Sequence, residues 1–466
     1  MKEEIAELFR KTYGEMPDCF TPVAPHGSSR TYYRVGNAKH TVVAAYNADE
    51  KENRAFVDFA KQLRHRGVNV PEIMAEDLKH GIYLQEDLGD RTLFDFIKTA
   101  SPEEIRQTYK RIVRELPRLQ ITATNGFDYT NAYPRKRFDD QSIRWDLNYF
   151  KYYFLKLADI PFSEDELERD FDTLTHYLLN TDTSFFLYRD FQSRNIMLKD
   201  GEIFFIDFQG ARQGALQYDL ASLLYDAKAD LSEELRKELL QTYMEELKKL
   251  IPVDEQEFID RFYAYVYTRI MQATGSYGYR GWFQQKTHFL QSIPFALDNL
   301  SRLQNAKRLK PNLPCLDRIF DRMVCNEKLR QLGTDSYKLT IAIKSFSYKK
   351  GYPHDISGNG GGYIFDCRCL PNPGRYERYK QMTGKDAEVI AFLEKEPEAE
   401  EFYAAAKSLV MQSIRRYKQR RFTNLSVYFG CTGGRHRSVY MAQRLATELQ
   451  KDEELDVQVS HVEQNG

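Results

Sequence analysis

The sequence predicts two successive domains, a bilobal α+β domain over residues 1–335 and an α/β domain with a mainly parallel sheet over residues 338–466. Three observations support this prediction. The chain has 466 residues, which is more than one hydrophobic core usually serves. β-Prone runs fill a small lobe up to about residue 88, and helical periodicity fills a larger lobe from about residue 89 to 335. Strands and helices alternate beyond residue 338.

The small lobe begins with a helix over residues 3–12, followed by strands over 32–35 and 41–46. An amphipathic helix is expected over residues 53–66, and two more strands over 70–73 and 81–89. Helices follow from residue 101. Their most prominent feature is an aromatic stripe containing Trp145, Tyr149, Tyr152 and Tyr153. Such a stripe is usually part of a core, and the alternative is a sugar-stacking wall beside an active site.

The segment 188–207 carries the chemistry. Asp190 is followed by four residues and then Asn195, the catalytic-loop spacing of the protein-kinase-like fold, in which the Asp orients a substrate hydroxyl and the Asn holds magnesium. Asp200-Gly201 between two β-prone runs predicts a tight hairpin. A turn centred there sets Asn195 opposite Ile206, so that Asn195 and Asp207 lie side by side. Two oxygen ligands suit a magnesium ion that also binds nucleotide phosphates.

A small-residue loop ahead of the strand expected over 32–35 is predicted to cover a nucleotide. It contains Gly27, Ser28, Ser29 and Arg30. Kinases place a lysine on the following strand, but residues 41–46 contain none. Glu52 is the expected partner of the missing cation, and Arg30, Arg34 or Lys39 are the candidates to replace it.

The connection between the lobes is expected to read adenine through its backbone. It consists of Gln85, Glu86, Asp87 and Leu88. Farther along, Asp219 begins an apolar helix. It fits either a helix N-cap or a brace for the catalytic loop, and the cap is the favoured interpretation.

The run from 187 to 227, with Tyr-Arg-Asp-Phe-Gln-Ser-Arg-Asn-Ile-Met-Leu and Asp-Phe-Gln-Gly-Ala, resembles the aminoglycoside phosphotransferase and choline kinase-like family. Within it, the likeness is to bacterial kinases that phosphorylate N-acetylmuramate and N-acetylglucosamine at the anomeric hydroxyl, and it covers roughly residues 1–330. The resemblance implies ATP, Mg²⁺, Asp190 as base, and Asn195 with Asp207 as metal ligands. Tyr188 departs from the histidine of many relatives.

In the second domain, strands are expected over 339–346, 363–367, 425–429 and 457–461, and helices over 399–417 and 438–449. A glycine-rich segment lies between a strand and a helix, where backbone amides and the helix N-terminus favour a phosphate. Its residues are Gly430, Cys431, Thr432, Gly433, Gly434, Arg435, His436, Arg437 and Ser438. The spacing of Cys431 and Arg437 also matches cysteine phosphatases, with Cys431 as nucleophile.

This segment, Leu-Pro-Asn-Pro at 370–373 and Met-Thr-Gly at 382–384 together resemble the C-terminal domain of the RNase adapter protein RapZ. The resemblance implies binding of glucosamine 6-phosphate, with Thr432, Gly433 and Arg437 on the sugar phosphate and His436 nearby. It also brings RNA into consideration, although the tail after residue 461 lacks the basic ending of the RNA-binding members. Gly374 stands where relatives have histidine.

The sequence therefore predicts an ATP- and Mg²⁺-dependent phosphotransferase for the hydroxyl of a cell-wall amino sugar, fused to a domain that senses an amino-sugar phosphate. The alternatives are a regulatory adapter with a degenerate kinase domain, and a phosphatase that uses Cys431. Lys plus Arg number 67 and Asp plus Glu number 68, so the total charge selects no nucleic-acid partner. Six cysteines without a regular framework and the lack of a long apolar run predict a cytoplasmic protein without a membrane partner.

Overall fold

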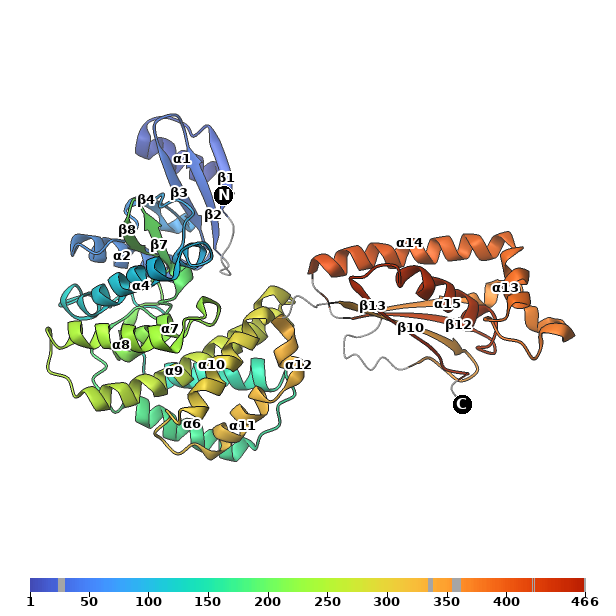
Figure 1. The fold of residues 1–466 in the computed structure, drawn as a ribbon. Coiled ribbons are helices and arrows are strands. Elements are labelled where there is room, and N and C mark those ends of the chain that lie inside the picture. The colour runs from blue at the N-terminus through green and yellow to red at the C-terminus, as the bar shows by residue number, and fades with distance from the viewer. Residues whose placement is uncertain (24–29, 334–337, 354–361, 421, 423, 465–466) are drawn as a thin grey trace. The chain divides into compact units, whose positions relative to one another are not determined.

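The computed structural model describes residues 1–23, 30–333, 338–353, 362–420, 422 and 424–464. The chain divides into two compact units, Met1–Tyr279 with Ser292–Arg330, and Arg280–Gln291 with Gln331–Gly466 (Figure 1). The expected domain boundary at residues 333–336 lies almost entirely outside the described residues. Within the described ranges, no helix has the length and apolar character needed to cross a bilayer.

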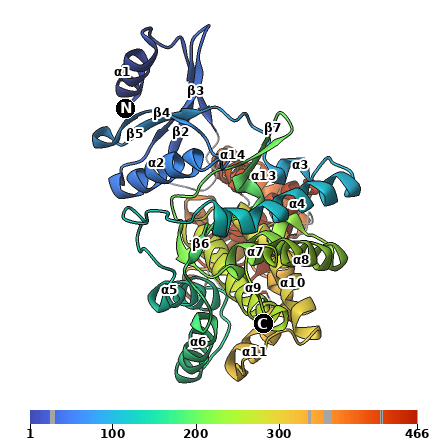
Figure 2. The same cartoon turned by 90° about the vertical axis from the view of Figure 1, so that its left-hand side faces the viewer.

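The first unit begins with an antiparallel sheet in the strand order β1-β2-β3-β5-β4. Its elements are α1 (Lys2–Tyr13), β1 (Cys19–Val23), β2 (Thr31–Gly36), β3 (Thr41–Tyr46), α2 (Glu50–His65), β4 (Ile73–Asp77) and β5 (Ile82–Glu86). The buried side chains of Ile5 and Phe9 on α1 pack against Val35 and Leu84 of the sheet. The small lobe is therefore a sheet with its own apolar core, and Figure 2 shows α2 between this sheet and the helical part.

The kinds of element predicted for the small lobe are confirmed, with three differences. Strand β1 was not predicted. The strand expected over residues 70–73 instead starts at Ile73, because Pro71 has no N–H to donate to a sheet. Helix α2 begins earlier than expected because the Asp49 side chain accepts the backbone N–H groups of Lys51 and Glu52 and so caps the helix.

The rest of the first unit is mainly helical, apart from two short two-stranded ribbons, β6-β9 and β7-β8. The helices are α3 (Leu93–Phe96), α4 (Pro102–Pro117), α5 (Asp140–Phe150), α6 (Glu164–Leu179), α7 (Gln217–Leu224), α8 (Glu233–Leu247), α9 (Glu255–Gly278), α10 (Ile293–Asn305), α11 (Pro314–Val324) and α12 (Glu327–Arg330). The strands are β6 (Phe185–Leu187), β7 (Ile196–Lys199), β8 (Glu202–Phe205) and β9 (Arg212–Gly214). The predicted bilobal α+β architecture is confirmed.

The second unit contains a parallel sheet in the order β11-β12-β10-β13. Its elements are β10 (Leu339–Ser347), β11 (Gly362–Asp366), α13 (Ala387–Glu394), α14 (Pro397–Arg420), β12 (Asn424–Cys431), α15 (Arg437–Leu449) and β13 (Leu455–His461). Alternate residues of β10 and β12 are buried in one core with residues of α14 and α15. The predicted α/β class with a mainly parallel sheet is confirmed, and the helix-to-strand alternation follows from the crossovers that parallel strands require.

Candidate active site

The hairpin β7-β8 brings the predicted metal ligands together. Asp200 and Gly201 have φ values of 52° and 79°, the left-handed pair of a tight hairpin turn. The strands pair Ile196 with Phe205, and the N–H of Ile206 donates to the carbonyl of Asn195 at 3.0 Å. The predicted register is confirmed. As a result, the Asn195 side-chain amide lies 3.3 Å from a carboxylate oxygen of Asp207.

Hydrogen bonds from Asn195 and Gln209 hold the acceptor oxygens of this site in place. Asn195 donates from Nδ2 to the carbonyl of Asp190 at 2.8 Å, which leaves its Oδ1 as the possible ligand atom. Gln209 donates to the second oxygen of Asp207 at 2.9 Å. Within the described ranges, no side chain donates a hydrogen bond to the carboxylate of Asp190, which is half-buried. Burial raises the pKa of Asp207, and the negative charge of Asp190 raises it further.

The free Oδ1 of Asn195 and the raised pKa of Asp207 beside Asp190 fit a divalent cation. Two like charges held close in a partly buried site repel each other, and a bound cation would relieve that repulsion. No cluster of three or more His, Cys, Asp or Glu side chains forms a metal site in the described part of the chain. A site with one carboxylate and one amide oxygen is incomplete by itself, as expected for Mg²⁺ that shares its coordination shell with phosphate oxygens and water.

Asp219 is a brace for the catalytic loop, and the favoured interpretation of it as an N-cap was wrong. Helix α7 starts at Gln217 with Leu216 at the cap position and no side-chain cap. The fully buried carboxylate of Asp219 instead accepts the backbone N–H groups of Tyr188 at 2.8 Å and Arg189 at 3.0 Å. Burial raises its pKa to about 6. The brace holds Arg189 at a φ of 84°, a left-handed conformation that costs a non-glycine residue energy.

Three further contacts hold the loop, and the sequence analysis did not identify two of the residues involved. The hydroxyl of Tyr188 donates to the carbonyl of Ile206, so the residue that replaces histidine ties the catalytic loop to the segment before Asp207. Asp146 of α5 accepts two hydrogen bonds from Arg189, at 2.7 and 2.6 Å. Asp226 accepts the backbone N–H of Ser193 at 3.1 Å. No local pattern marks Asp146 or Asp226, because their partners are distant in the sequence.

Arg30 is the cation that lies beside Glu52. Its guanidinium is 3.5 Å from the Glu52 carboxylate, and its side chain is fully buried. The other two candidates are paired elsewhere, Arg34 with Asp87 at 2.6 Å and Lys39 with Glu15 at 2.7 Å. Gly27, Ser28 and Ser29, the rest of the predicted nucleotide loop, lie outside the described residues.

Aromatic rings connect this ion pair to the metal-site segment. The Arg30 guanidinium lies over the ring of Phe56, 5.5 Å from its centroid. Phe56 in turn stacks on Phe208 with centroids 4.7 Å apart, and Phe208 directly follows Asp207. The charge of Arg30 also lowers the pKa of Asp207, against the raising effects of burial and of Asp190. Arg30, Glu52 and Asp207 therefore belong to one electrostatic cluster.

Two acidic side chains of the predicted adenine-reading segment are hydrogen-bonded within the protein. Asp87 accepts from Arg34, and Glu86 accepts from Lys199 Nζ at 3.0 Å. The same Nζ donates to the carbonyl of Asp87 at 3.0 Å. Gln85 and Glu86 end strand β5, and Leu88 is buried. Recognition of adenine by the backbone of this segment stays a prediction.

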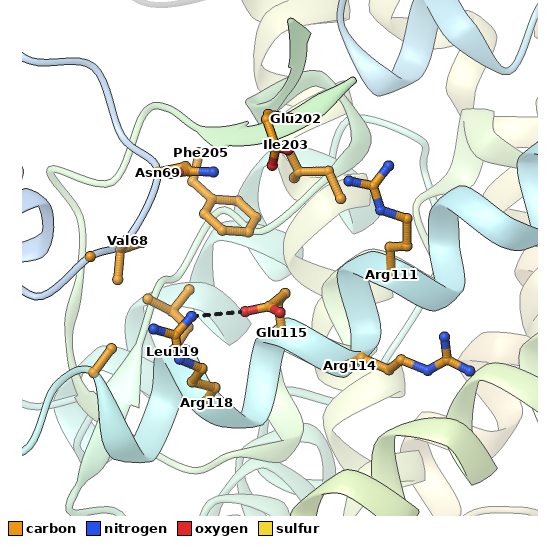
Figure 3. A pocket seen from close by; sticks show the side chains of 12 residues that line it. Val68, Asn69, Arg111, Arg114, Glu115, Arg118, Leu119, Glu202, Ile203 and Phe205 are labelled. Carbon is orange, nitrogen blue, oxygen red and sulfur yellow. Dashed lines mark hydrogen bonds and ion pairs between the residues drawn. The ribbon is translucent and has the colours of Figure 1, made fainter. Parts of the chain in front are cut away.

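The first unit also contains a cavity of about 340 Å³ (Figure 3). Its lining comes from helix α4, from the loop at Gly67–Asn69 and from strand β8, and it includes Glu115 bonded to Arg118 at 3.2 Å. Asp190, Asn195 and Asp207 are absent from the lining. The backbone N–H of Phe205 donates to the carbonyl of Asn69 at 2.9 Å, so the cavity wall joins the loop after α2 to the strand that leads to Asp207.

The glycine-rich segment of the second unit forms the turn from β12 into α15. Cys431 ends the strand and is buried, whereas Thr432 and Gly433 are exposed and present their backbone to solvent. His436 lies 2.9 Å from the carbonyl of Tyr379 through Nε2. A Cβ added at Gly374 would come within 3.4 Å of the His436 ring. The position at which relatives have histidine is thus adjacent to His436.

The Arg437 side chain of this segment is hydrogen-bonded within the protein. It is buried, and its Nη1 donates to the carbonyls of Arg368 and Leu370 at 3.0 and 2.9 Å. Nη2 lies 3.4 Å from the Thr432 hydroxyl and remains the atom best placed for an anion. Cys431 Sγ lies 3.1 Å from the Ser438 hydroxyl. Burial raises the pKa of Cys431, but hydrogen bonds from Ser438, the charge of Arg437 and the Gly434 backbone together lower the pKa below its ordinary value.

In a comparison with known protein families, two family models match successive parts of the chain. The model of the phosphotransferase enzyme family matches residues 20–252, half of the chain. The model of the RapZ C-terminal domain matches residues 339–465.

Curated relatives carry the name nucleotide-binding protein. One from Halorhodospira halophila is 42% identical over 113 residues, which is 24% of this chain and 38% of the relative. Another, from Glaesserella parasuis, is 33% identical over 173 residues, which is 36% of this chain and 58% of the relative. The chain thus spans less than two thirds of the length of these relatives.

Solved structures with a similar fold include a choline kinase from Cryptosporidium parvum Iowa II. It is 12% identical with a TM-score of 0.47, and the match covers 69% of this chain and 100% of that one. The amicoumacin kinase hAmiN, solved with AMP-PNP, Ca²⁺ and Ami, is 15% identical with a TM-score of 0.45, and the match covers 69% of this chain and 93% of that one.

Proposed function

This chain belongs to the phosphotransferase enzyme family, and we propose that it transfers the γ-phosphoryl group of ATP to the anomeric hydroxyl of an amino sugar. N-Acetylmuramate and N-acetylglucosamine are the proposed acceptors. The observation that carries this proposal is the convergence of Asp190, Asn195 and Asp207 at one end of the hairpin β7-β8. Acidic groups placed so that one carboxylate raises the pKa of the other are characteristic of functional sites, and Asp190 has this effect on Asp207.

In the proposed reaction, Asp190 orients the acceptor hydroxyl and receives its proton. Its carboxylate is suited to this because no described side chain donates to it. Asn195 Oδ1 and the Asp207 carboxylate would hold Mg²⁺, which supplies positive charge to the nucleotide phosphates. Asp219 and Tyr188 position the loop by bonding its backbone, so that Asp190 is preorganised and needs little rearrangement during the reaction.

Arg30 takes the place of the missing strand lysine in this proposal. Kinases pair that lysine with a helix glutamate and use it on the nucleotide phosphates. Here Arg30 pairs with Glu52 of helix α2. An arginine can donate to Glu52 and to a phosphate at the same time, because its guanidinium carries five N–H groups. The Arg30–Glu52 pair argues against the alternative function, a regulatory adapter with a degenerate kinase domain.

For the second unit we propose binding of an amino-sugar phosphate such as glucosamine 6-phosphate at the turn of residues 431–438. Exposed Thr432 and Gly433 would contact the phosphate through backbone amides at the start of α15. A phosphatase reaction at Cys431 is less well supported, because Arg437 Nη1 is held by two carbonyls and the thiol is buried. The proposed domains are residues 1–335 and 338–466. No observation on the described residues favours RNA as a partner.

A cytoplasmic location follows from the proposed chemistry. ATP and amino-sugar intermediates are substrates of that compartment, and all six cysteines are free.

The test is ADP release by the full chain with Mg²⁺ and ATP across N-acetylmuramate, N-acetylglucosamine, glucosamine, choline and an aminoglycoside. We expect turnover on an acetylated amino sugar that is lost in Asp190→Asn. Asp200→Asn is the matched control, because Asp200 lies in the exposed hairpin turn and asparagine tolerates its positive φ. Turnover on choline or the aminoglycoside alone would refute the proposal that the acceptor is an acetylated amino sugar. ATP binding without turnover on any acceptor would favour the adapter function.

We also propose that ligand binding to the second unit changes the kinase rate, and a separate experiment tests this. Glucosamine 6-phosphate is titrated by calorimetry and then added to the ADP-release assay. Binding that changes the turnover rate supports sensing. Binding without any change in turnover refutes regulation of the kinase by the second unit. Absence of binding refutes glucosamine 6-phosphate as the ligand of that unit.

A further inference from the structure

The aromatic residues of helix α5 and the turn that continues it divide into two groups. Phe150 and Phe154 are fully buried and belong to the core. Trp145 is 45% exposed, and Tyr149 and Tyr153 are half-buried. Trp145 and Tyr149 are four residues apart and so share one face of the helix. The stripe that the sequence marked as core is therefore only partly core.

The two half-buried tyrosines pack against Tyr279, which follows the end of α9. The ring of Tyr153 lies 4.9 Å from that of Tyr149 and 4.8 Å from that of Tyr279, measured between centroids. Gly275 allows this contact, since a Cβ there would come within 2.9 Å of the backbone of Tyr149 and Phe150. We call Trp145, Tyr149, Tyr153 and Tyr279 the aromatic wall. Close backbone packing makes it a rigid surface.

One end of the aromatic wall is attached to the catalytic loop. Asp146, the residue after Trp145, bonds Arg189 through both carboxylate oxygens, and Arg189 precedes Asp190. Both side chains of this ion pair are largely buried, where a bidentate pair has well-defined geometry. The position of Trp145 is therefore fixed relative to Asp190 by one helix residue and one ion pair.

From this arrangement we propose that the aromatic wall is the acceptor site and that the pyranose ring of the acceptor stacks on Trp145. This inference rests on the proposed phosphotransferase function and extends it to the substrate class. A pyranose has an apolar C–H face and a polar rim, and an exposed indole held in place buries such a face while leaving the rim to hydrogen-bond. One polar residue lies beside the indole. The Arg135 guanidinium is over the Trp145 ring, 5.9 Å from its centroid, and is bonded to Asp139.

Tyr152 provides a matched control on the same segment. It is 48% exposed, about as much as Trp145. Lys151 and Lys156 lie over its ring at 4.8 and 4.9 Å, and it makes no contact with Tyr149, Tyr153 or Tyr279 that would place it in the wall. It is an exposed aromatic residue without the connection to Asp190.

A binding experiment tests the wall without relying on turnover. The chain has two tryptophans, so Trp282→Phe leaves Trp145 as the single indole fluorophore. This variant is used after its ADP release has been matched to that of the wild type. N-Acetylglucosamine, N-acetylmuramate and the acyclic polyol glucitol are titrated in turn. We expect a saturable change in emission with an amino sugar and none with glucitol. The same response to all three, or no response to either sugar, would overturn the proposal.

Kinetics supply the second test. Trp145→Ala is expected to raise the KM for the acceptor at least tenfold and to leave the KM for ATP unchanged, which also shows that the fold is intact. Trp145→Phe is expected to restore most of the affinity, and Tyr152→Ala to have no effect. If the acceptor KM of Trp145→Ala is within twofold of the wild-type value, the aromatic wall is not the acceptor site. Absence of turnover in the wild type on every acceptor refutes the proposed function instead, so the two failures are distinguishable.

Discussion

Replacing Asp219 tests the architecture of the catalytic loop most directly. In Asp219→Ala, the backbone N–H groups of Tyr188 and Arg189 lose their acceptor while remaining buried. Each unsatisfied buried group costs about 1–3 kcal/mol, so the free energy of unfolding of the first unit should fall by about 4 kcal/mol. Asp219→Asn keeps the shape but has a single acceptor oxygen, so a loss of about 2 kcal/mol is expected. Turnover should fall at least tenfold, because Arg189 no longer holds Asp190.

The loss should depend on pH with a defined sign. Burial raises the pKa of Asp219 to about 6 in the folded chain, above the value of about 3.9 in an unfolded chain. The folded state therefore binds the proton more tightly, and the contribution of Asp219 to stability is fully present below pH 4 and is lost as the pH rises through 6. Asparagine does not titrate. The destabilisation by Asp219→Asn should thus be about 1 kcal/mol larger at pH 5 than at pH 7.

Urea unfolding followed by Trp145 fluorescence in the Trp282→Phe background measures this effect, at pH 5 and at pH 7. Asp165→Asn is the control, because Asp165 is a largely exposed member of a surface ion pair with Arg169 and such pairs contribute about 0–1 kcal/mol. If Asp219→Asn unfolds at the urea concentration of the wild type and retains its turnover, the brace has no role. A destabilisation that is larger at pH 7 than at pH 5 would refute the assigned pKa shift.

Three further predictions concern other parts of the chain. Arg30→Met should raise the KM for ATP at least tenfold, while Lys39→Met, which removes a surface partner of the small lobe, should leave it unchanged; equal KM values in the two variants would refute the role of Arg30. His461 is buried, and burial lowers its pKa to about 4, so the neutral ring is favoured on folding. The second unit should therefore lose about 1–2 kcal/mol of stability between pH 7 and pH 5. The loss would be seen as lower protection factors of the β10 amides, corrected for the intrinsic exchange rate at each pH, and would be absent in a His461→Gln variant. Gly275→Ala should destabilise the first unit by about 1–3 kcal/mol and raise the acceptor KM, because a Cβ would displace α5 from α9; urea unfolding unchanged from the wild type would show that the helices adapt.

The sequence by itself determined the features that depend on local spacing. The turn at Asp200-Gly201 sets the register of the hairpin, and the register places Asn195 beside Asp207. This was predictable because two adjacent residues at positive φ fix both strands that leave the turn. The parallel sheet of the second unit followed in the same way from the alternation of strands and helices.

The tertiary structure decided everything that depends on distant partners. Three basic residues were equivalent candidates for Glu52, and only folding placed Arg30 next to it. Asp219 had the local signature of a cap, but its partners are the backbone N–H groups of residues about 30 positions away. The aromatic stripe of α5 had one helical period, and packing against α9 determined that Phe150 is buried and Trp145 is exposed. The physical reason is common to all three. A local pattern fixes the direction of a side chain, but the charge or surface that it meets comes from another part of the chain.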